Sequence, residues 1–170
     1  MIGPLKGQYD EEPAAGWRKA VPAGSIMLGS LVTIWPFVAS FPFLPPFGLL
    51  MLLGWRLARP GVLAIWAPLP LGFFDDLFSG QPMGSAILLW QACFIVIDLI
   101  DHRLVFRDFW QDWLIAAGAI AFCLIAGRLV ATPIGAHVDT VLLLQAMVSV
   151  MLFPFAARLA VWLDRRRAVE

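Results

Sequence analysis

The sequence predicts an all-α protein built as a polytopic membrane bundle of about six transmembrane helices, and three observations support this prediction. Of the 170 residues, 61% are hydrophobic and only 14% are charged, whereas soluble chains contain about 45–50% apolar and about 25% charged residues. The apolar residues form runs that are separated by Pro/Gly pairs and charged clusters, and the basic residues are concentrated in alternate connections. A soluble domain of this length could not bury so much apolar surface in one core.

Six apolar runs are candidates for transmembrane helices, each of which needs about 20 mostly apolar residues. They are residues 23–44, 46–57, 61–78, 84–100, 109–130 and 140–163. The second run is too short for a straight span, so we expect one limb of a hairpin or a re-entrant element there. Pro68 and Pro70 are expected to kink or locally unwind the third run. The chain then divides into a flexible cytoplasmic tail (1–22), a transmembrane domain (23–163) and a basic cytoplasmic tail (164–170).

The basic residues predict the orientation, because Lys and Arg collect in short cytoplasmic loops. With six crossings and a cytoplasmic N-terminus, eleven of the twelve basic residues fall on the cytoplasmic side, and five crossings would scramble this pattern. They are Lys6, Arg18, Lys19, Arg56, Arg59, Arg103, Arg107, Arg158, Arg165, Arg166 and Arg167. Both termini are therefore expected in the cytoplasm. The last three arginines anchor the final helix and could also hold anionic lipid, while a net charge of zero gives no reason to expect nucleic-acid binding.

Two adjacent aspartates interrupt the apolar stretch "PLGFFDDLFSGQPMGSAILLW", residues 70–90. Asp76 lies at the end of the third run, where a carboxylate opposes the dipole of its own helix but favours the N-terminus of the next one. Gly80 and Gly84 provide the turn between the two helices. We predict that Asp76 closes this outward hairpin, while Asp75, about 100° further round the helix, faces a neighbouring helix or water.

The spacing of Gly72, Asp76, Gly80 and Gly84, with an apolar helix following, resembles the signature of the rod shape-determining protein MreD family. The chain length, the compact multispan core and the basic C-terminus are similar as well. The resemblance implies a non-enzymatic component of the bacterial inner membrane that acts in cell elongation and lateral peptidoglycan synthesis. It implies association with MreC, with a wall-synthesis transpeptidase and glycan polymerase, and indirectly with MreB. It also implies a fold similar to the substrate-binding subunits of energy-coupling-factor transporters.

A small-molecule binding or transport subunit is the second functional hypothesis, with a solute held by the proline-broken third helix and an outward pocket. Polar residues are scarce in the middle of the runs, so few hydrogen-bonding side chains are available to bind a solute. This scarcity favours a scaffold.

Asp98 and Asp101 lie on one face of the fourth helix because they are three residues apart. They are expected to pair with Arg56, Arg103 or Arg158. Either an ion cluster that fixes the loop geometry or a proton or ion site would explain them.

No catalytic residue, metal site or cofactor is expected. Asp76 and Asp98 lie on opposite membrane sides, which excludes them as a catalytic pair. His102 and His137 are also on opposite sides, without neighbours at zinc-ligand spacing.

Small residues in the fifth run, 116–127, form a surface for close helix packing. They are Gly118, Ala119, Cys123 and Ala126. This surface contacts either a partner span or another helix of the same chain. Cys93 and Cys123 lie within apolar runs, where they act as small hydrophobic residues, and no disulfide is expected.

Overall fold

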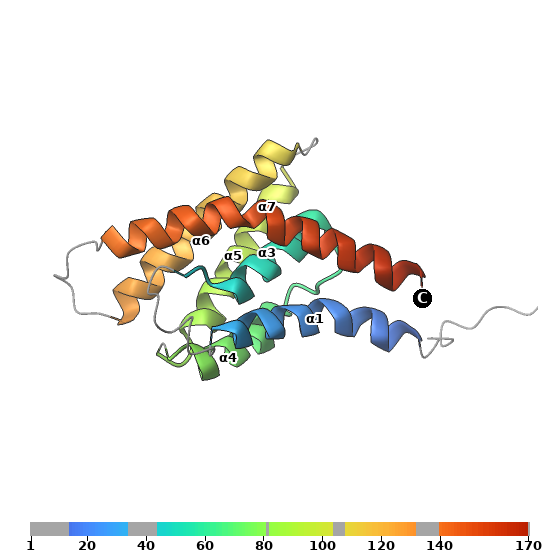
Figure 1. Cartoon of the computed structure of the whole chain (residues 1–170), viewed down its shortest axis with the longest axis horizontal. Coiled ribbons are helices and arrows are strands. Elements are labelled where there is room, and N and C mark those ends of the chain that lie inside the picture. Colours follow the sequence, from blue (N-terminus) through green and yellow to red (C-terminus); the bar gives the residue numbers. More distant parts are fainter. Residues whose placement is uncertain (1–13, 34–43, 81, 104–107, 132–139, 170) are drawn as a thin grey trace, which may run out of the picture.

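The computed structural model describes residues 14–33, 44–80, 82–103, 108–131 and 140–169, and these residues form six helices and no strand. The predicted all-α class is therefore confirmed. The helices are α1 (Ala14–Val32), α3 (Phe47–Ala58), α4 (Pro68–Ser79), α5 (Ser85–Asp101), α6 (Phe109–Ala131) and α7 (Thr140–Val169). Figure 1 shows α1 and α7 on either side of α3, with α4 beside α1.

Two of the described helices are long and apolar enough to cross a membrane, judged by length and composition. They are α6 and the part Thr140–Arg166 of α7. The segments Ala20–Val32 and Phe47–Ala58 are apolar but shorter. The six-span count is therefore still a prediction.

Helix α3 forms the centre of the bundle. It has 12 residues, which span about 18 Å at 1.5 Å per residue, so it is as short as predicted. Every residue from Gly48 to Leu57 is buried, and α3 packs against α1, α6 and α7. A helix that is apolar on all sides is expected in a core, and here three helices cover it.

The third predicted run begins differently from the expectation. Residues 59–67 form turns, and α4 begins only at Pro68. Of the two alternatives for Pro68 and Pro70, a kink within a longer helix is therefore wrong, whereas the part of the run before Pro68 is unwound into turns. Both prolines lie in the first turn, where the missing N–H groups have no intrahelical acceptor to lose and the fixed φ suits a helix.

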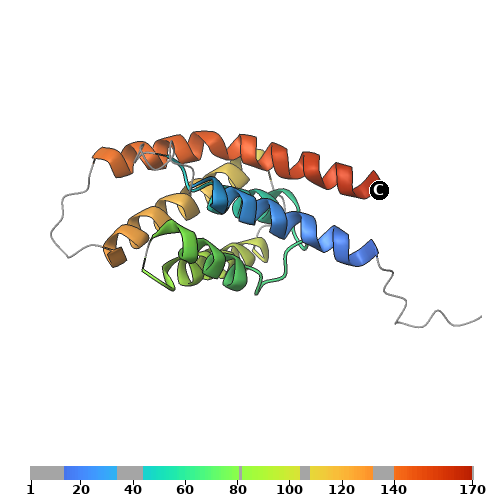
Figure 2. The ribbon, with the colours of Figure 1, turned by 60° about the horizontal axis from the view of Figure 1, so that its bottom comes forward.

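Both ends of the bundle are more helical than expected. Helix α1 already begins at Ala14, within the predicted tail 1–22, and it contains Pro22. Helix α7 continues to Val169 and so includes most of the predicted tail 164–170. The N-terminal end of α1 and the C-terminal end of α7 lie at the same end of the molecule in both views (Figures 1 and 2).

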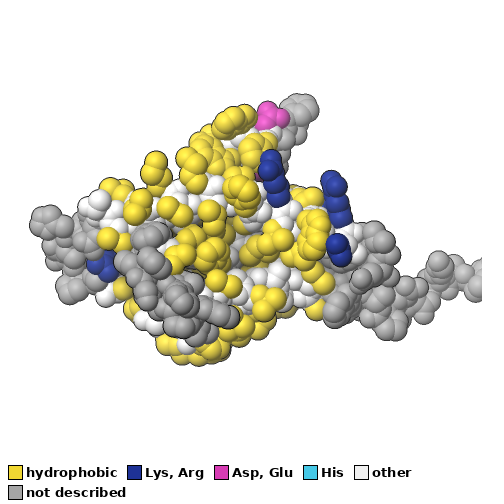
Figure 3. All heavy atoms as spheres, in the orientation of Figure 1, with side chains coloured by type: hydrophobic (Ala, Val, Ile, Leu, Met, Phe, Trp, Pro, Cys, Tyr) yellow, Lys and Arg dark blue, Asp and Glu magenta, His cyan; other side chains and the backbone are white. Residues whose placement is uncertain are grey.

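The surface carries large apolar side chains on every described helix except α3. Leu88 on α5 is 72% exposed and Trp110 on α6 is 69% exposed. In Figure 3 apolar side chains cover most of the described surface of one face, and most of its basic side chains stand on the right-hand side. An apolar surface of this extent is typical of a protein that contacts lipid or other proteins.

Gly54 allows α3 to approach α7 closely, which gives a test of the packing. A Cβ atom at Gly54 would lie 3.1 Å from the carbonyl oxygen of Ala156, whereas a Cβ at Gly118 would meet nothing within 4 Å. We expect Gly54→Val to lower the free energy of unfolding by about 1–3 kcal/mol and the matched control Gly118→Val to change it less. Thermal unfolding of the purified protein, followed by circular dichroism, measures both. Equal midpoints for the two variants would contradict the packing described.

Candidate functional site

The carboxylate of Asp76 binds the start of α5. Its Oδ2 accepts a hydrogen bond from the backbone N–H of Gly84 at 2.9 Å, and its Oδ1 accepts one from the N–H of Ala86 at 2.9 Å. The hydroxyl of Ser85 donates a third at 3.2 Å, and the N–H of Ile87 lies at 3.4 Å. Asp76 is only 3% exposed. The contact predicted from the sequence is therefore present, and the cap of α5 comes from the preceding helix.

Asp76 supplies hydrogen-bond acceptors that the start of α5 otherwise lacks. The first N–H groups of a helix have no partner within the helix, and the N-cap residue Gly84 has no side chain to provide one. A carboxylate here satisfies several donors and also faces the positive end of the helix dipole. The interaction joins α4 to α5 across the turn.

The glycines of the motif shape this hairpin in two ways. Gly80 ends α4 with φ 68° and Gly84 precedes α5 with φ 96°, a left-handed conformation that glycine adopts without strain. Gly72 acts by its size, because a Cβ atom there would lie 2.9 Å from backbone atoms of Ala86 and Ile87. The absence of a side chain at Gly72 therefore lets α4 and α5 touch, which brings Asp76 within reach of its donors.

Asp75 points to a different part of the bundle. It is half-buried, and a Cβ atom built on Gly48 of α3 would lie 3.0 Å from its Oδ1. The same Cβ would overlap with the hydroxyl oxygen of Ser30 in α1 and lie 3.2 Å from the indole of Trp90 in α5. Asp75 thus faces neighbouring helices, one of the two expected surroundings. The roles of Ser30 and Gly48 were missed, because no local pattern in the sequence relates them to Asp75.

A second polar cluster joins the end of α3 to the end of α5. The guanidinium of Arg56, which is 7% exposed, lies 2.8 Å from the carboxylate of Asp98 and 3.0 Å from that of Asp101. It also lies 5.6 Å from the centre of the Phe94 ring. Of the three arginines that the sequence offered as partners, the structure brings Arg56 to this pair. The exposed Arg103 forms no ion pair with any residue that the structure describes.

One further ion pair was missed in the sequence. Arg59, just after α3, lies 2.7 Å from the carboxylate of Asp164 in α7. Asp164 was assigned to the tail 164–170, and only the continuation of α7 brings it to the core, where it is 8% exposed. Together with the Arg56 cluster, this pair fixes three helix ends at one end of the bundle.

The histidines and cysteines do not form a metal site in the described part of the chain. No group of three or more His, Cys, Asp or Glu side chains there could hold a metal ion. His102 lies 3.5 Å from Asp98, and His137 lies outside the described residues. Cys93 and Cys123 are buried free thiols whose sulfur atoms are 3.4 Å apart between α5 and α6.

The small residues of α6 divide between two environments. Cys123 packs against α5, and the carbonyl oxygen of Ala119 lies 3.9 Å from the sulfur of Cys93. Gly118 is exposed, with open space above its Cα atom. Part of this surface is therefore used for packing within the chain, one of the two alternatives, and the side of Gly118 is open.

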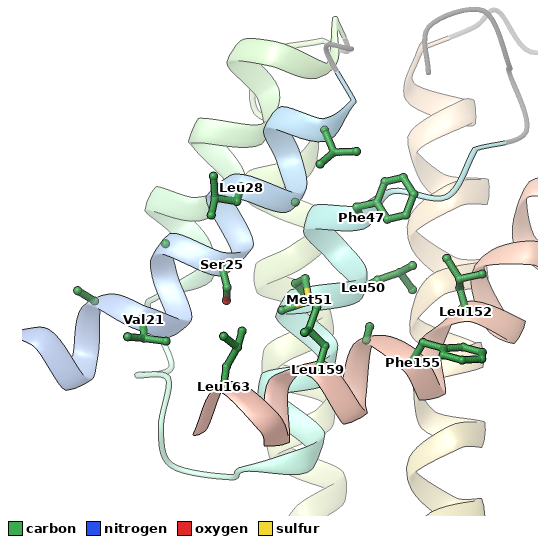
Figure 4. Close-up of a pocket in the computed structure, with 15 residues that line it drawn as sticks. Val21, Ser25, Leu28, Phe47, Leu50, Met51, Leu152, Phe155, Leu159 and Leu163 are labelled. Carbon is green, nitrogen blue, oxygen red and sulfur yellow. The ribbon is translucent and has the colours of Figure 1, made fainter. Parts of the chain in front are cut away.

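An apolar groove of about 820 Å³ lies between α1, α3 and α7. In Figure 4 side chains of α1 and α7, among them Leu28 and Leu159, line the two sides of this groove, with Met51 of α3 between them. Ser25 supplies the one hydroxyl group of the described lining. That hydroxyl accepts a hydrogen bond from the indole N–H of Trp55 at 2.8 Å and donates one to the carbonyl oxygen of Pro22 at 2.8 Å, so its hydrogen-bonding capacity is largely used within the protein.

No protein-family model, curated protein or solved structure matches this chain. The relation to the MreD family therefore remains a resemblance that rests on the spacing of Gly72, Asp76, Gly80 and Gly84 and on the general architecture.

Replacement of the two aspartates separates their roles. Asp76→Ala leaves several buried N–H groups of α5 without an acceptor, so we expect it to lower the free energy of unfolding by about 2 kcal/mol. Asp75→Ala removes a half-buried carboxylate without uncapping a helix and is expected to stay within about 1 kcal/mol of wild type. Asp76→Asn retains one acceptor oxygen and should fall between them. Denaturant titration in detergent measures all three, and an equal loss for Asp75→Ala and Asp76→Ala would contradict the assigned roles.

The hairpin glycines give a second test. Gly72→Ala places a methyl group against the backbone of α5 and should cost about 1–3 kcal/mol of stability. Gly80→Asn should be nearly neutral, because asparagine tolerates the left-handed conformation and a Cβ at Gly80 meets nothing within 4 Å. The same titration compares the two variants. A Gly72→Ala protein with the same free energy of unfolding as wild type would show that α4 and α5 do not make the close contact described.

Proposed function

We propose that this chain is a multi-pass protein of the bacterial cytoplasmic membrane and acts as a non-enzymatic scaffold of the cell-elongation machinery, as the resemblance to MreD implies. Its partners are then MreC and the transpeptidase and glycan polymerase of lateral peptidoglycan synthesis, with MreB acting indirectly. The bilayer is the environment in which these contacts form.

The observation that carries the proposal is how the buried charges are used. Three charged side chains are buried in the described part of the chain, namely Arg56, Asp76 and Asp164. Each holds one helix end to another through ion pairs or backbone hydrogen bonds. Such groups stabilise a fixed arrangement of helices, which is what a scaffold needs. Helices α5, α6 and α7 expose many large apolar side chains, and such surfaces suit contacts with other transmembrane helices.

The arrangement of the helix ends supports the proposed topology. The start of α1 and the end of α7 lie at the same end of the molecule (Figures 1 and 2), as an even number of crossings requires. Eleven of the twelve basic residues of the sequence fall on the same side when six crossings are assumed.

A solute-binding transport subunit is the second candidate, and the groove between α1, α3 and α7 is what favours it. Its volume of about 820 Å³ lies within the range of about 300–1,000 Å³ for ligand pockets. Ligand pockets also carry a few placed polar groups that fix orientation, whereas the one hydroxyl of this groove, on Ser25, is already hydrogen-bonded. The groove therefore offers a polar solute little to bind, and the scaffold explains it better.

The proposal is tested in rod-shaped cells that depend on this protein. A photocrosslinking amino acid is placed at Leu28 or Leu159 in the groove, or at Phe122 or Ile125 on the exposed face of α6. Because partner spans must contact a lipid-facing surface, we expect at least one of these faces to capture an elongation protein, and depletion of the protein should round the cells. The same photocrosslinking amino acid at the buried position Ile120 is the control and should capture no partner protein.

Two results would contradict the scaffold. Unchanged cell shape after depletion, together with no captured elongation protein at any exposed position, would remove it. Capture of the two ATPase subunits of a transporter would favour the second candidate.

A further inference from the structure

A second hollow, of about 490 Å³, lies where the C-terminal parts of α3 and α7 meet the start of α6. It differs from the first groove because it combines apolar walls with charged side chains. The charged members of its described lining are Arg158, Arg165 and Asp112. We call it the arginine groove.

The two arginines are aligned along the arginine groove. Arg158 and Arg165 are seven residues apart on α7, so they share one face and lie about 10 Å apart along the helix axis. Both are exposed, and neither forms an ion pair or a hydrogen bond with any residue that the structure describes. Arg56 and Arg59, by contrast, are both paired with aspartates. The groove thus presents two guanidinium groups whose donors are available, and guanidinium groups bind phosphate well.

The remaining lining is suited to hydrocarbon. Phe109 and Val161 contribute to it, together with Phe153 from the core cluster. Trp162, which is 49% exposed, also lines it, and tryptophan side chains favour the boundary between hydrocarbon and headgroups. A molecule that fills the arginine groove must therefore be anionic at one end and apolar along its length.

The net charge of the arginine groove, which includes Asp112, favours one class of lipid headgroup. Asp112 lies in the first turn of α6, where the positive end of its own helix stabilises its charge. With two arginines and one aspartate, the charged lining carries a net positive charge. This charge favours a headgroup with net negative charge over one in which an ammonium group neutralises the phosphate.

We infer that the arginine groove binds an anionic glycerophospholipid of the surrounding membrane, with the headgroup phosphate at Arg158 and Arg165 and an acyl chain against Phe109 and Val161. This site is separate from the Asp76 hairpin. It requires that the helices lie in a membrane but not that the protein acts in cell elongation, so either inference can fail alone.

Native mass spectrometry of the full-length protein in detergent tests the site, with phosphatidylglycerol, phosphatidylethanolamine or phosphatidylcholine added in turn. We expect phosphatidylglycerol to be retained best. Because one arginine near a headgroup is worth about a factor of five in affinity, Arg158→Gln and Arg165→Gln should each weaken retention about fivefold. Arg166→Gln is the matched control, since Arg166 lies 4.4 Å from the ring centre of Trp162 and is not part of the groove lining. It should retain lipid like wild type.

Several outcomes would overturn the inference. Equal retention of phosphatidylglycerol by wild type and by the double variant Arg158→Gln/Arg165→Gln would do so, as would equal retention of all three lipids by wild type. If wild type instead prefers phosphatidylethanolamine and Asp112→Asn loses this preference, the groove binds an ammonium group through Asp112. Displacement of the bound lipid by free glycerol phosphate would show that the acyl chain does not contribute. Comparison of the three lipids on wild type needs no variant, so it stands even if a substitution prevents folding.

Discussion

The hydrogen bonds from the start of α5 to the carboxylate of Asp76 are the constraint on which the rest of the bundle depends. A helix that begins in apolar surroundings needs an acceptor for its first N–H groups, since an unsatisfied buried donor is costly. Gly84 and Ser85 stand at that start, and Asp76 supplies the acceptor from α4. This requirement explains why a carboxylate lies within one of the most apolar stretches of the chain and why Gly72 has no side chain.

The constraint extends along α5 to the other end of the bundle. Asp98 and Asp101 hold Arg56 at the end of α3, and the following Arg59 holds Asp164 of α7. Helix α3, surrounded by apolar side chains, is thus fixed at one end by charge pairs. Removing one partner of a buried ion pair leaves an uncompensated charge and is strongly destabilising, so these pairs hold the helix ends in this arrangement.

Local chemistry predicted part of this arrangement. The position of Asp76 relative to the next helix followed from helix dipoles and turn residues, and the shortness of α3 followed from its flanking prolines and basic residues. The spacing of Asp98 and Asp101 predicted that they share one face, but it left three arginines as possible partners. Contacts that depend on how distant helices meet were not predictable in this way. The pair of Arg59 and Asp164 required the continuation of α7, and the position of Asp75 beside Gly48 required the way in which α4 lies against α3. The start of α4 at Pro68 was missed because an apolar composition does not distinguish a turn from a helix.

Hydrogen–deuterium exchange of the backbone amides of Gly84 and Ala86, in the full-length protein in detergent, tests the central interaction most directly. The account predicts that these amides exchange as slowly as those in the middle of α5, and that only the first turn of α5 becomes fast when Asp76 is replaced. Fast exchange of both amides in the wild-type protein would contradict it, because their hydrogen bonds to Asp76 would then not hold the hairpin together.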